Sequence, residues 1–157
     1  MPTGSEASAA IAGPLYCDAS ALAKLYLPEP ESDALNRLLA GREDALVSDL
    51  AITEVVSALG RRVRRGELAA GPARRVHRKI LAHLAEGPYR KVELLTETHR
   101  EAERILLASR SAAIRSADAL HLALALGAGA GTLLTFDRTM AKASLEQGLA
   151  VWPEAGP

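Results

Sequence analysis

The chain has 157 residues, which fits one domain, and its 48% hydrophobic and 24% charged residues are typical of a globular protein. Basic and acidic side chains number 19 each, so the net charge is zero and gives no support for nucleic-acid binding. The single cysteine, Cys17, excludes an internal disulfide framework and a cysteine-rich zinc site. No apolar run approaches the ~20 residues that cross a bilayer.

The two ends of the chain differ from the middle in composition. Residues 1–13 are mostly small or polar, and they lack the basic start and long apolar stretch of a secretory signal. We therefore expect a flexible tail over residues 1–13, one domain over residues 14–152 and a short tail over residues 153–157. With no signal and one thiol, the expected compartment is the cytoplasm.

The elements alternate along the chain. Short apolar runs predict five strands, over residues 15–17, 45–47, 91–94, 132–136 and 149–151. Helix formers and helical spacing predict helices between them, over residues 19–26, 30–40, 49–65, 72–86, 98–109, 118–126 and 138–146. Strands of this kind, separated by helices, are typical of a parallel sheet covered on both faces. The expected fold class is α/β, with three α/β/α layers around a five-stranded, mostly parallel sheet.

Helix starts are expected at capping residues. Ser48 or Asp49 can cap the long helix that Gly66 ends. Thr98 and Glu101 stand in capping-box spacing, and Ser116 is expected to cap the helix over residues 118–126.

Four acidic residues occupy positions where this fold would gather them. Asp18 and Asp137 directly follow two predicted strands, and ligands of open parallel sheets bind beyond the carboxyl ends of the strands. Asp118 falls in the first turn of a short apolar helix, and Glu54 lies early in the helix after the second strand. The simpler interpretation of each aspartate is a helix cap, worth ~0.3–1 kcal/mol, and that of Glu54 is a solvated side chain.

The acids also stand within recurring local motifs. These are Asp18-Ala-Ser20-Ala-Leu-Ala-Lys24, Thr53-Glu54, Arg115-Ser116-Ala-Asp118-Ala and Leu134-Thr135-Phe136-Asp137. In this order and at these separations, the motifs resemble those of PIN-domain nucleases, most closely the VapC-type ribonuclease toxins of bacterial toxin–antitoxin pairs. The resemblance runs from Leu15 to Val151. The sequence departs from it in a longer N-terminal tail and in Met140, where an aromatic residue is common.

The resemblance implies a PIN-like nuclease domain over residues 14–152 that hydrolyses RNA phosphodiester bonds. It assigns catalysis and metal binding to Asp18, Glu54, Asp118 and Asp137, with Ser20 and Thr135 holding a ligand or water in place. Mg²⁺ or Mn²⁺ is the expected cofactor, because hard cations take carboxylate ligands and lower the pKa of bound water. Asp18 and Asp118 are the best candidates for direct ligands, with Asp137 and Glu54 next.

The zero net charge conceals an asymmetry. Residues 61–79 contain eight basic residues and one acidic residue, so this segment carries +7 and the rest of the chain carries −7. Counting about 100° per residue, Arg61 and Arg65 fall near the helix face of Glu54. A basic ridge there could hold an RNA backbone, and a solvated helical hairpin is the alternative.

The remaining candidates give no better site. His121 is three residues after Asp118, and we expect it to serve in packing or in holding a metal ligand. Cys17, in an apolar strand, is expected to be an inert core residue.

The expected partners are an RNA substrate, a VapB-like antitoxin whose tail covers the active site, and a second copy of the chain in a homodimer. Binding to a membrane is not expected. Three alternatives stay open: a non-catalytic RNA- or protein-binding module on the same fold, a nuclease for structured DNA, and a receiver-like phosphoacceptor domain. The receiver would need an adjacent acidic pair after the first strand and a lysine after a late strand. Here Cys17 and Ala19 flank Asp18, and Arg138 follows Asp137.

Overall fold

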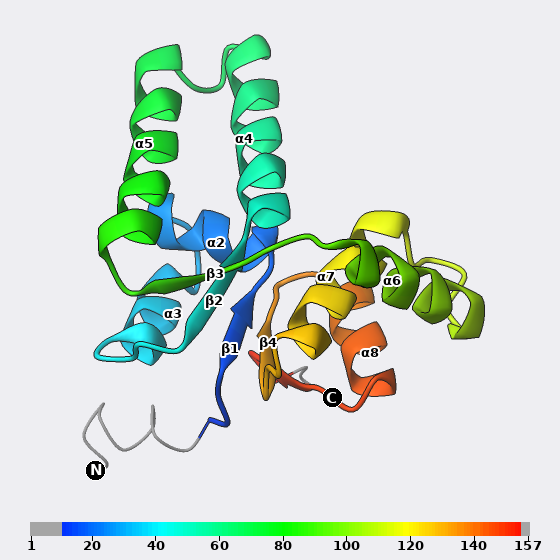
Figure 1. The fold of residues 1–157 in the computed structure, drawn as a ribbon. Helices are drawn as coiled ribbons and strands as arrows, with labels where there is room; N and C mark the ends of the chain where they lie inside the picture. The colour runs from blue at the N-terminus through cyan, green and yellow to red at the C-terminus, as the bar shows by residue number, and fades with distance from the viewer. Residues whose placement is uncertain (1–10, 155–157) are drawn as a thin grey trace.

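The computed structural model describes residues 11–154, which form one sheet with helices on both faces (Figure 1). The strands are β1 (Leu15–Cys17), β2 (Ala45–Ser48), β3 (Tyr89–Val92), β4 (Thr132–Leu134) and β5 (Ala150–Trp152). The helices are α2 (Ala19–Tyr26), α3 (Ser32–Leu39), α4 (Asp49–Arg64), α5 (Ala70–Glu86), α6 (Thr96–Ala108), α7 (Ser116–Gly127) and α8 (Arg138–Glu146). The predicted α/β class and five-stranded sheet are confirmed.

The strand order is β3-β2-β1-β4-β5, and all four pairings are parallel. The chain therefore extends the sheet from β1 to one side and then returns to continue on the other side from β4. Ligands bind at such a point of reversal, outside the carboxyl ends of the strands. Receiver-like domains have the order 2-1-3-4-5, so the observed order argues against that alternative.

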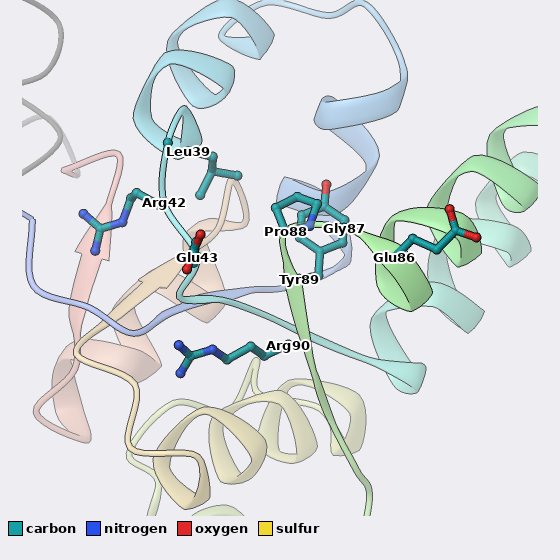
Figure 2. Close-up of a pocket in the computed structure, with 9 residues that line it drawn as sticks. Leu39, Arg42, Glu43, Glu86, Gly87, Pro88, Tyr89 and Arg90 are labelled. Atoms are coloured by element: carbon teal, nitrogen blue, oxygen red, sulfur yellow. The ribbon is translucent and has the colours of Figure 1, made fainter.

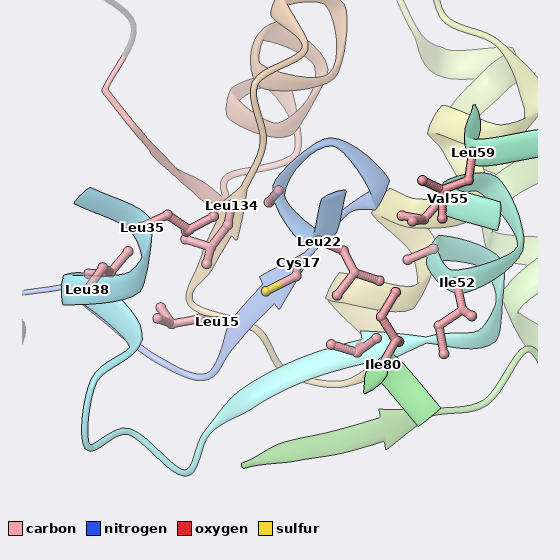
Figure 3. Packing of buried hydrophobic residues seen from close by; sticks show 13 residues of the cluster. Leu15, Cys17, Leu22, Leu35, Leu38, Ile52, Val55, Leu59, Ile80 and Leu134 are labelled. Carbon is pink, nitrogen blue, oxygen red and sulfur yellow. The ribbon is translucent and has the colours of Figure 1, made fainter. Parts of the chain in front are cut away.

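One face of the sheet is covered by α2, α3, α4 and α5. Leu15 and Cys17 of β1 point to this face, where Leu22, Leu35 and Ile80 are fully buried (Figure 3). Burying a leucine or isoleucine side chain contributes about 1.5–3 kcal/mol, so this cluster fixes α2 and α5 against the strands.

The opposite face is covered by α6, α7 and α8. Tyr16, which lies between Leu15 and Cys17, points to this side together with Leu46 and Leu133. The side-chain alternation of β1 therefore supplies both cores. It also sets the fully buried Tyr16 beneath the carboxyl edge of the sheet.

The α4–α5 hairpin projects beyond the sheet (Figure 1). It contains all of the basic segment over residues 61–79, and seven of the eight basic side chains there are exposed. Within the described residues none of these eight forms an ion pair. The positive charge is thus held on one projecting element.

Several predicted boundaries were wrong, including those of the strand expected over residues 132–136, which ends at Leu134, and of the helix expected over residues 72–86, which begins at Ala70. The edge strand β3 spans Tyr89–Val92 instead of residues 91–94, because the register pairs Tyr89 with Ala45 and leaves Leu94 in the exposed connection that follows. Helix α6 begins at Thr96: the backbone N–H of Leu95 donates to Thr98 Oγ1 at 3.2 Å, so Thr98 stands inside the first turn.

Another wrong boundary is at α7. The helix begins at Ser116 rather than Asp118, and Arg115, not Ser116, occupies the N-cap position. Asp118 is therefore the third residue of the helix, where its carboxylate accepts a bond from the Arg115 backbone N–H. The cap predicted at Ser48 is confirmed, since its Oγ accepts from the Ala51 N–H at 3.1 Å.

The expected tails fall mostly on residues 1–10 and 155–157, which lie outside the described part of the chain. Residues 11–13, by contrast, contact the folded domain. Ile11 packs against the core, and the Ala12 carbonyl accepts a 2.6 Å hydrogen bond from Thr132 Oγ1. A Cβ at Gly131 would lie 2.8 Å from that carbonyl oxygen, so the close approach requires glycine. Among the described helices, none combines the length and hydropathy needed to cross a membrane.

Candidate active site

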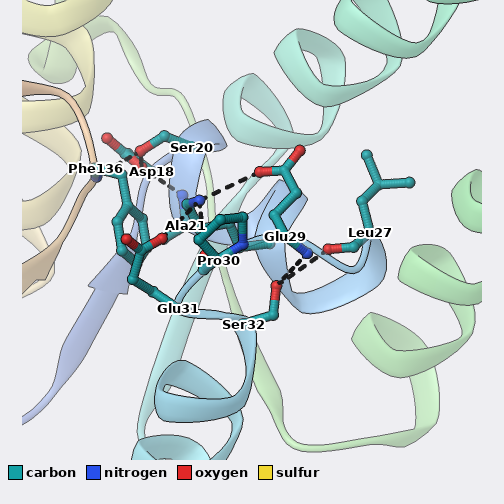
Figure 4. Close-up of polar contacts among 10 residues, drawn as sticks. Asp18, Ser20, Ala21, Leu27, Glu29, Pro30, Glu31, Ser32 and Phe136 are labelled. Atoms are coloured by element: carbon teal, nitrogen blue, oxygen red, sulfur yellow. Dashed lines mark hydrogen bonds and ion pairs between the residues drawn. The ribbon is translucent and has the colours of Figure 1, made fainter. Parts of the chain in front are cut away.

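Asp18 lies at the carboxyl end of the central strand β1 and is 3% exposed. It is the N-cap of α2, and its Oδ1 accepts from the Ala21 backbone N–H at 2.9 Å and from Ser20 Oγ at 2.6 Å (Figure 4). Aspartate is favoured at an N-cap because it satisfies an N–H that the helix leaves unpaired. The interpretation of Asp18 as a helix cap is therefore correct. Its burial is not needed for capping, because a cap at the protein surface makes the same hydrogen bond.

Burial raises the pKa of the Asp18 carboxyl above its ordinary value. Hydrogen bonds from Ser20, Thr135 and the Ala21 backbone oppose this effect, as does the nearby His121, and they do not overcome it. A buried carboxylate with incomplete compensation favours either a proton or a cation. Asp18 is thus chemically suited to a cation at the sheet edge.

Asp137 follows β4 and joins Asp18 through two hydroxyl groups. Ser20 Oγ lies 3.5 Å from Thr135 Oγ1, and the latter accepts from the Asp137 backbone N–H at 3.1 Å. Ser20 Oγ also accepts from the Phe136 N–H at 2.8 Å. The structure therefore brings Asp18, Ser20, Thr135 and Asp137 into one network, as expected from their places after neighbouring strands.

The side chain of Asp137 also serves as a cap. Its Oδ1 accepts from the Met140 N–H at 2.9 Å, which is the same geometry that Asp18 makes with Ala21. Unlike Asp18, Asp137 is exposed. The two aspartates thus differ in burial while sharing a structural role.

Glu54 lies on α4 and belongs to a second network. Its Oε2 is 2.6 Å from Nε2 of His121 on α7, and Nδ1 of the same ring is 2.8 Å from the Tyr16 hydroxyl. Glu54 is half-buried, whereas His121 is 2% exposed. Glu54 is therefore held by a buried partner rather than left free in solvent, and the interpretation of it as a solvated glutamate was wrong.

The two networks adjoin at β1. Tyr16 and Asp18 are separated by one residue, and burial raises the pKa of the Tyr16 hydroxyl, with smaller contributions from Asp18 and Glu54. His121 in turn lowers the pKa of Asp18. These electrostatic effects link the first carboxylate network to the second.

Asp118 is the acid that the structure joins least to the others. Its Oδ2 accepts from the Arg115 backbone N–H at 2.9 Å, which orients the carboxylate back to the start of its own helix. It stands one helical turn before His121, the residue that reaches Glu54. Asp118 is therefore near the second network without a bond to it.

The chemistry of this donor set fits a hard divalent cation, because all four side chains offer carboxylate oxygens. The spacing is more open: within residues 11–154, no three acidic, histidine or cysteine side chains stand close enough together to hold one metal ion. Asp118, Asp137 and Glu54 each make their hydrogen bonds within this described range through one oxygen, leaving the second for another partner. The metal-ligand roles stay a prediction.

Lys24, which ends the first motif, is not available to bind a phosphate. Its ammonium group contacts Glu29 at 3.3 Å, Glu31 at 3.2 Å and the Pro30 carbonyl at 3.0 Å, and it lies 4.7 Å from the centre of the Phe136 ring. These contacts hold residues 29–31, which precede α3, close to the network of Asp18. They also cover one side of the Phe136 ring, which disfavours base stacking there.

Sequence reasoning missed the roles of Tyr16 and Ser48. The sequence pattern predicts Tyr16 as an ordinary residue of a buried strand and Ser48 only as a helix cap. Only the strand alternation that turns Tyr16 toward α7 could have suggested its contact with His121. Cys17 is buried, and burial raises the pKa of its thiol to about 12, which agrees with an inert core residue.

The hollow drawn in Figure 2 lies elsewhere. It has a volume of about 710 Å³ and is lined in part by Arg42, Glu43, Tyr89 and Arg90. These residues precede or begin β2 and β3, so the hollow lies at the amino ends of the strands. It is therefore at the edge of the sheet opposite the four acids.

The fold is that of a known class. The PIN domain family model matches residues 15–145, and the chain belongs to this family. Its relatives include Ribonuclease VapC46 of Mycobacterium tuberculosis, which is 39% identical over 142 residues that cover 87% of this chain and 95% of the relative. Ribonuclease VapC3 of Pyrobaculum aerophilum is 32% identical over 128 residues, covering 82% and 92% of the two chains.

Solved structures agree on the fold. The crystal structure of VapC20 from Mycobacterium tuberculosis, described as a sarcin-ricin loop cleaving toxin, superposes with a TM-score of 0.65 at 18% identity and covers 82% of this chain and 94% of that one. The crystal structure of FitAcB from Neisseria gonorrhoeae gives a TM-score of 0.60 at 16% identity, with coverage of 87% and 95%. The three-layer fold is thus a PIN-domain fold.

Proposed function

We propose that the protein is an endoribonuclease that depends on a divalent metal and acts as the toxin of a toxin–antitoxin pair. The observation that carries the proposal is the pair Asp18 and Asp137, joined through Ser20 and Thr135 where the strand order reverses. The VapC ribonucleases that are 39% and 32% identical over most of their length support RNA as the substrate.

Asp18, Asp118, Asp137 and Glu54 would hold the metal, with Asp18 and Asp118 as the direct ligands. A bound Mg²⁺ or Mn²⁺ supplies an activated water and neutralises charge on the phosphate. The buried Asp18 supports this assignment, because its raised pKa marks a carboxylate that lacks a counter-charge. Ser20 and Thr135 would keep Asp18 in place by their hydroxyl groups.

Arg61 and Arg65 would guide the RNA backbone to the acids. Both are exposed, Arg61 on the helix that carries Glu54 and Arg65 as its C-cap, seven and eleven residues beyond Glu54. At about 1.5 Å per residue, they lie about 10 Å and 16 Å along the helix from Glu54. These separations suit successive phosphates of one strand, and arginine pairs well with phosphate oxygens.

The family suggests the protein's partners. We infer a VapB-like antitoxin whose tail covers the acidic edge, and a homodimer, with the cytoplasm as the place of action. Copurification of the chain with the product of a neighbouring gene, and its mass in solution, would test these inferences.

The test of function compares RNA and DNA substrates in Mg²⁺, Mn²⁺ and EDTA. We expect the wild type to cut RNA only with a metal and Asp118→Asn to cut nothing while keeping its circular dichroism spectrum. Asp33→Asn is the matched control, because Asp33 is an exposed aspartate in the first turn of α3, and it should cut normally. Cleavage of duplex DNA alone would favour a DNA nuclease, and RNA binding without cleavage would favour a non-catalytic module.

A further inference from the structure

The second network forms a continuous chain of hydrogen bonds across four elements. Ser48 Oγ accepts from the Ala51 N–H at 3.1 Å and lies 2.9 Å from the Tyr16 hydroxyl. Tyr16 Oη is 2.8 Å from His121 Nδ1, and His121 Nε2 is 2.6 Å from Glu54 Oε2. The chain starts at the N-cap of α4 and returns to α4 two turns later, after crossing β1 and α7.

With a neutral His121 ring, the donors and acceptors of this chain fit in one direction. A carboxylate can only accept, so at 2.6 Å the His121 Nε2 must carry the hydrogen that points to Glu54. In the neutral ring, Nδ1 is then an acceptor, and Tyr16 must donate to it. Tyr16 Oη is left to accept from the Ser48 hydroxyl, whose oxygen already accepts from the Ala51 N–H.

Burial supports this direction at each step. Tyr16, Ser48 and His121 are each at most 2% exposed, so water cannot readily replace a lost hydrogen-bond partner. Burial also raises the pKa of the Tyr16 hydroxyl, which keeps its proton available to donate. In contrast, the opposite neutral tautomer would direct a ring lone pair at a carboxylate oxygen.

We propose that His121 is a positioning residue that holds the Glu54 carboxylate at the acidic edge through its Nε2–H, and that Tyr16 and Ser48 fix this tautomer. The proposal rests on the proposed function in one respect, namely that Glu54 takes part in metal binding. Partners that orient a metal ligand in this way commonly contribute 10–100-fold to metal affinity or activity.

The first test observes the tautomer directly in the full chain. Long-range ¹H–¹⁵N spectra of the imidazole rings, recorded in EDTA, should show hydrogen on Nε2 of His121. Tyr16→Phe removes the donor to Nδ1 and should change this pattern. An Nε2 without hydrogen in the wild type, or a pattern that Tyr16→Phe leaves unchanged, would overturn the proposal.

The second test separates positioning from packing by two amide variants. His121→Gln places an amide N–H near the position of Nε2 and can reach Glu54, whereas the shorter side chain of His121→Asn ends near Nδ1 and can reach only Tyr16. Calorimetric titration with Mn²⁺ should give an affinity within about threefold of wild type for His121→Gln and at least tenfold weaker for His121→Asn. Equal affinities for the two folded variants would contradict the proposal.

The chain offers a matched control for Tyr16. Tyr26 Oη lies 2.7 Å from Nδ1 of His83, which is the same kind of bond between α2 and α5. Tyr26→Phe should leave the Mn²⁺ affinity and the His121 spectrum unchanged, while Tyr16→Phe alters both. If the wild type binds no Mn²⁺ and cuts no RNA, the proposed function fails, and the ring spectra still decide whether His121 donates to Glu54.

Discussion

Asp18→Asn should stabilise the metal-free protein while it abolishes RNA cleavage. The substitution keeps a side-chain oxygen that can accept from the Ala21 N–H and Ser20 Oγ, and asparagine is as good an N-cap as aspartate. It removes a negative charge from a side chain that is 3% exposed and whose pKa burial raises. The Asp18 carboxylate, which metal binding would need, thus destabilises the fold when no metal is bound.

Two opposing effects determine how much Asp18→Asn changes the free energy of unfolding. The negative charge at the start of α2 favours the helix dipole by about 0.3–1 kcal/mol, and its loss is unfavourable. The relief of burial is the larger effect, because the raised pKa already includes the hydrogen bonds that favour the charged form. We expect a net gain of about 0.5–2 kcal/mol, which corresponds to about 2–4 °C in Tm for each kcal/mol.

The sign of the pH dependence follows from the raised pKa. Above the unfolded value of about 3.9, the unfolded chain loses this proton while native Asp18 retains it, so wild-type stability falls as pH rises until the native pKa is passed. Asp18→Asn has no carboxyl group at this position, so its stability does not fall with rising pH for this reason. The difference in unfolding free energy between the two proteins should therefore grow from acid toward neutral pH.

The assay is urea denaturation in EDTA at several pH values, with Asp137→Asn as the control. Asp137 makes the same 2.9 Å cap bond but is exposed, so its substitution should cost about 0.3–1 kcal/mol and show no gain. Destabilisation of folded Asp18→Asn at neutral pH, equal to that of Asp137→Asn, would refute the reasoning.

Three further predictions concern neighbouring features of the site. Ser20→Ala removes a bond to Asp18 and leaves the Phe136 N–H unpaired, so thermal denaturation should show a loss of about 1–3 kcal/mol, against little change for the exposed Ser57→Ala. Arg61→Gln combined with Arg65→Gln should reduce the salt slope of RNA binding by about 1.4, at about 0.7 for each phosphate contact to a single strand. The double variant Arg100→Gln and Arg104→Gln on α6, whose guanidinium groups pair with Glu103 and Glu101, should keep the wild-type slope, and an equal loss in both would argue against the basic ridge. Asp118→Asn should lose cleavage while its unfolding free energy stays within about 1 kcal/mol of the wild type, and full activity would remove Asp118 from the site.

Much of the fold could be predicted because the elements carry local signals. Asp18 and Ser48 mark two helix starts by their capping side chains, and the apolar run over Leu15–Cys17 identifies the central strand. The edge strand β3 was placed two residues too late, because Arg90 and Lys91 are exposed there and leave little apolar pattern. Strand order has no local signal at all, since it depends on which strands pair across the sheet.

The acidic site, too, could be predicted from the sequence only in part. Asp18 and Asp137 could be placed together because both were expected to follow strands directly. Asp18 does follow β1 directly, Asp137 stands three residues after β4, and the structure links them through Ser20 and Thr135. The contact between Glu54 and His121 joins residues 67 positions apart and depends on how α7 packs against α4, so no sequence spacing predicts it. The resemblance to PIN domains named the four acids, while the polar groups that hold them became visible only in the structure.

The central claim is that the acidic edge binds a divalent metal for RNA cleavage. Calorimetric titration of Mn²⁺ into the wild type, Asp18→Asn and Asp33→Asn tests it most directly. We predict saturable binding to the wild type and to Asp33→Asn, and its loss in folded Asp18→Asn. Equal binding to all three proteins, or none to the wild type, would contradict the account.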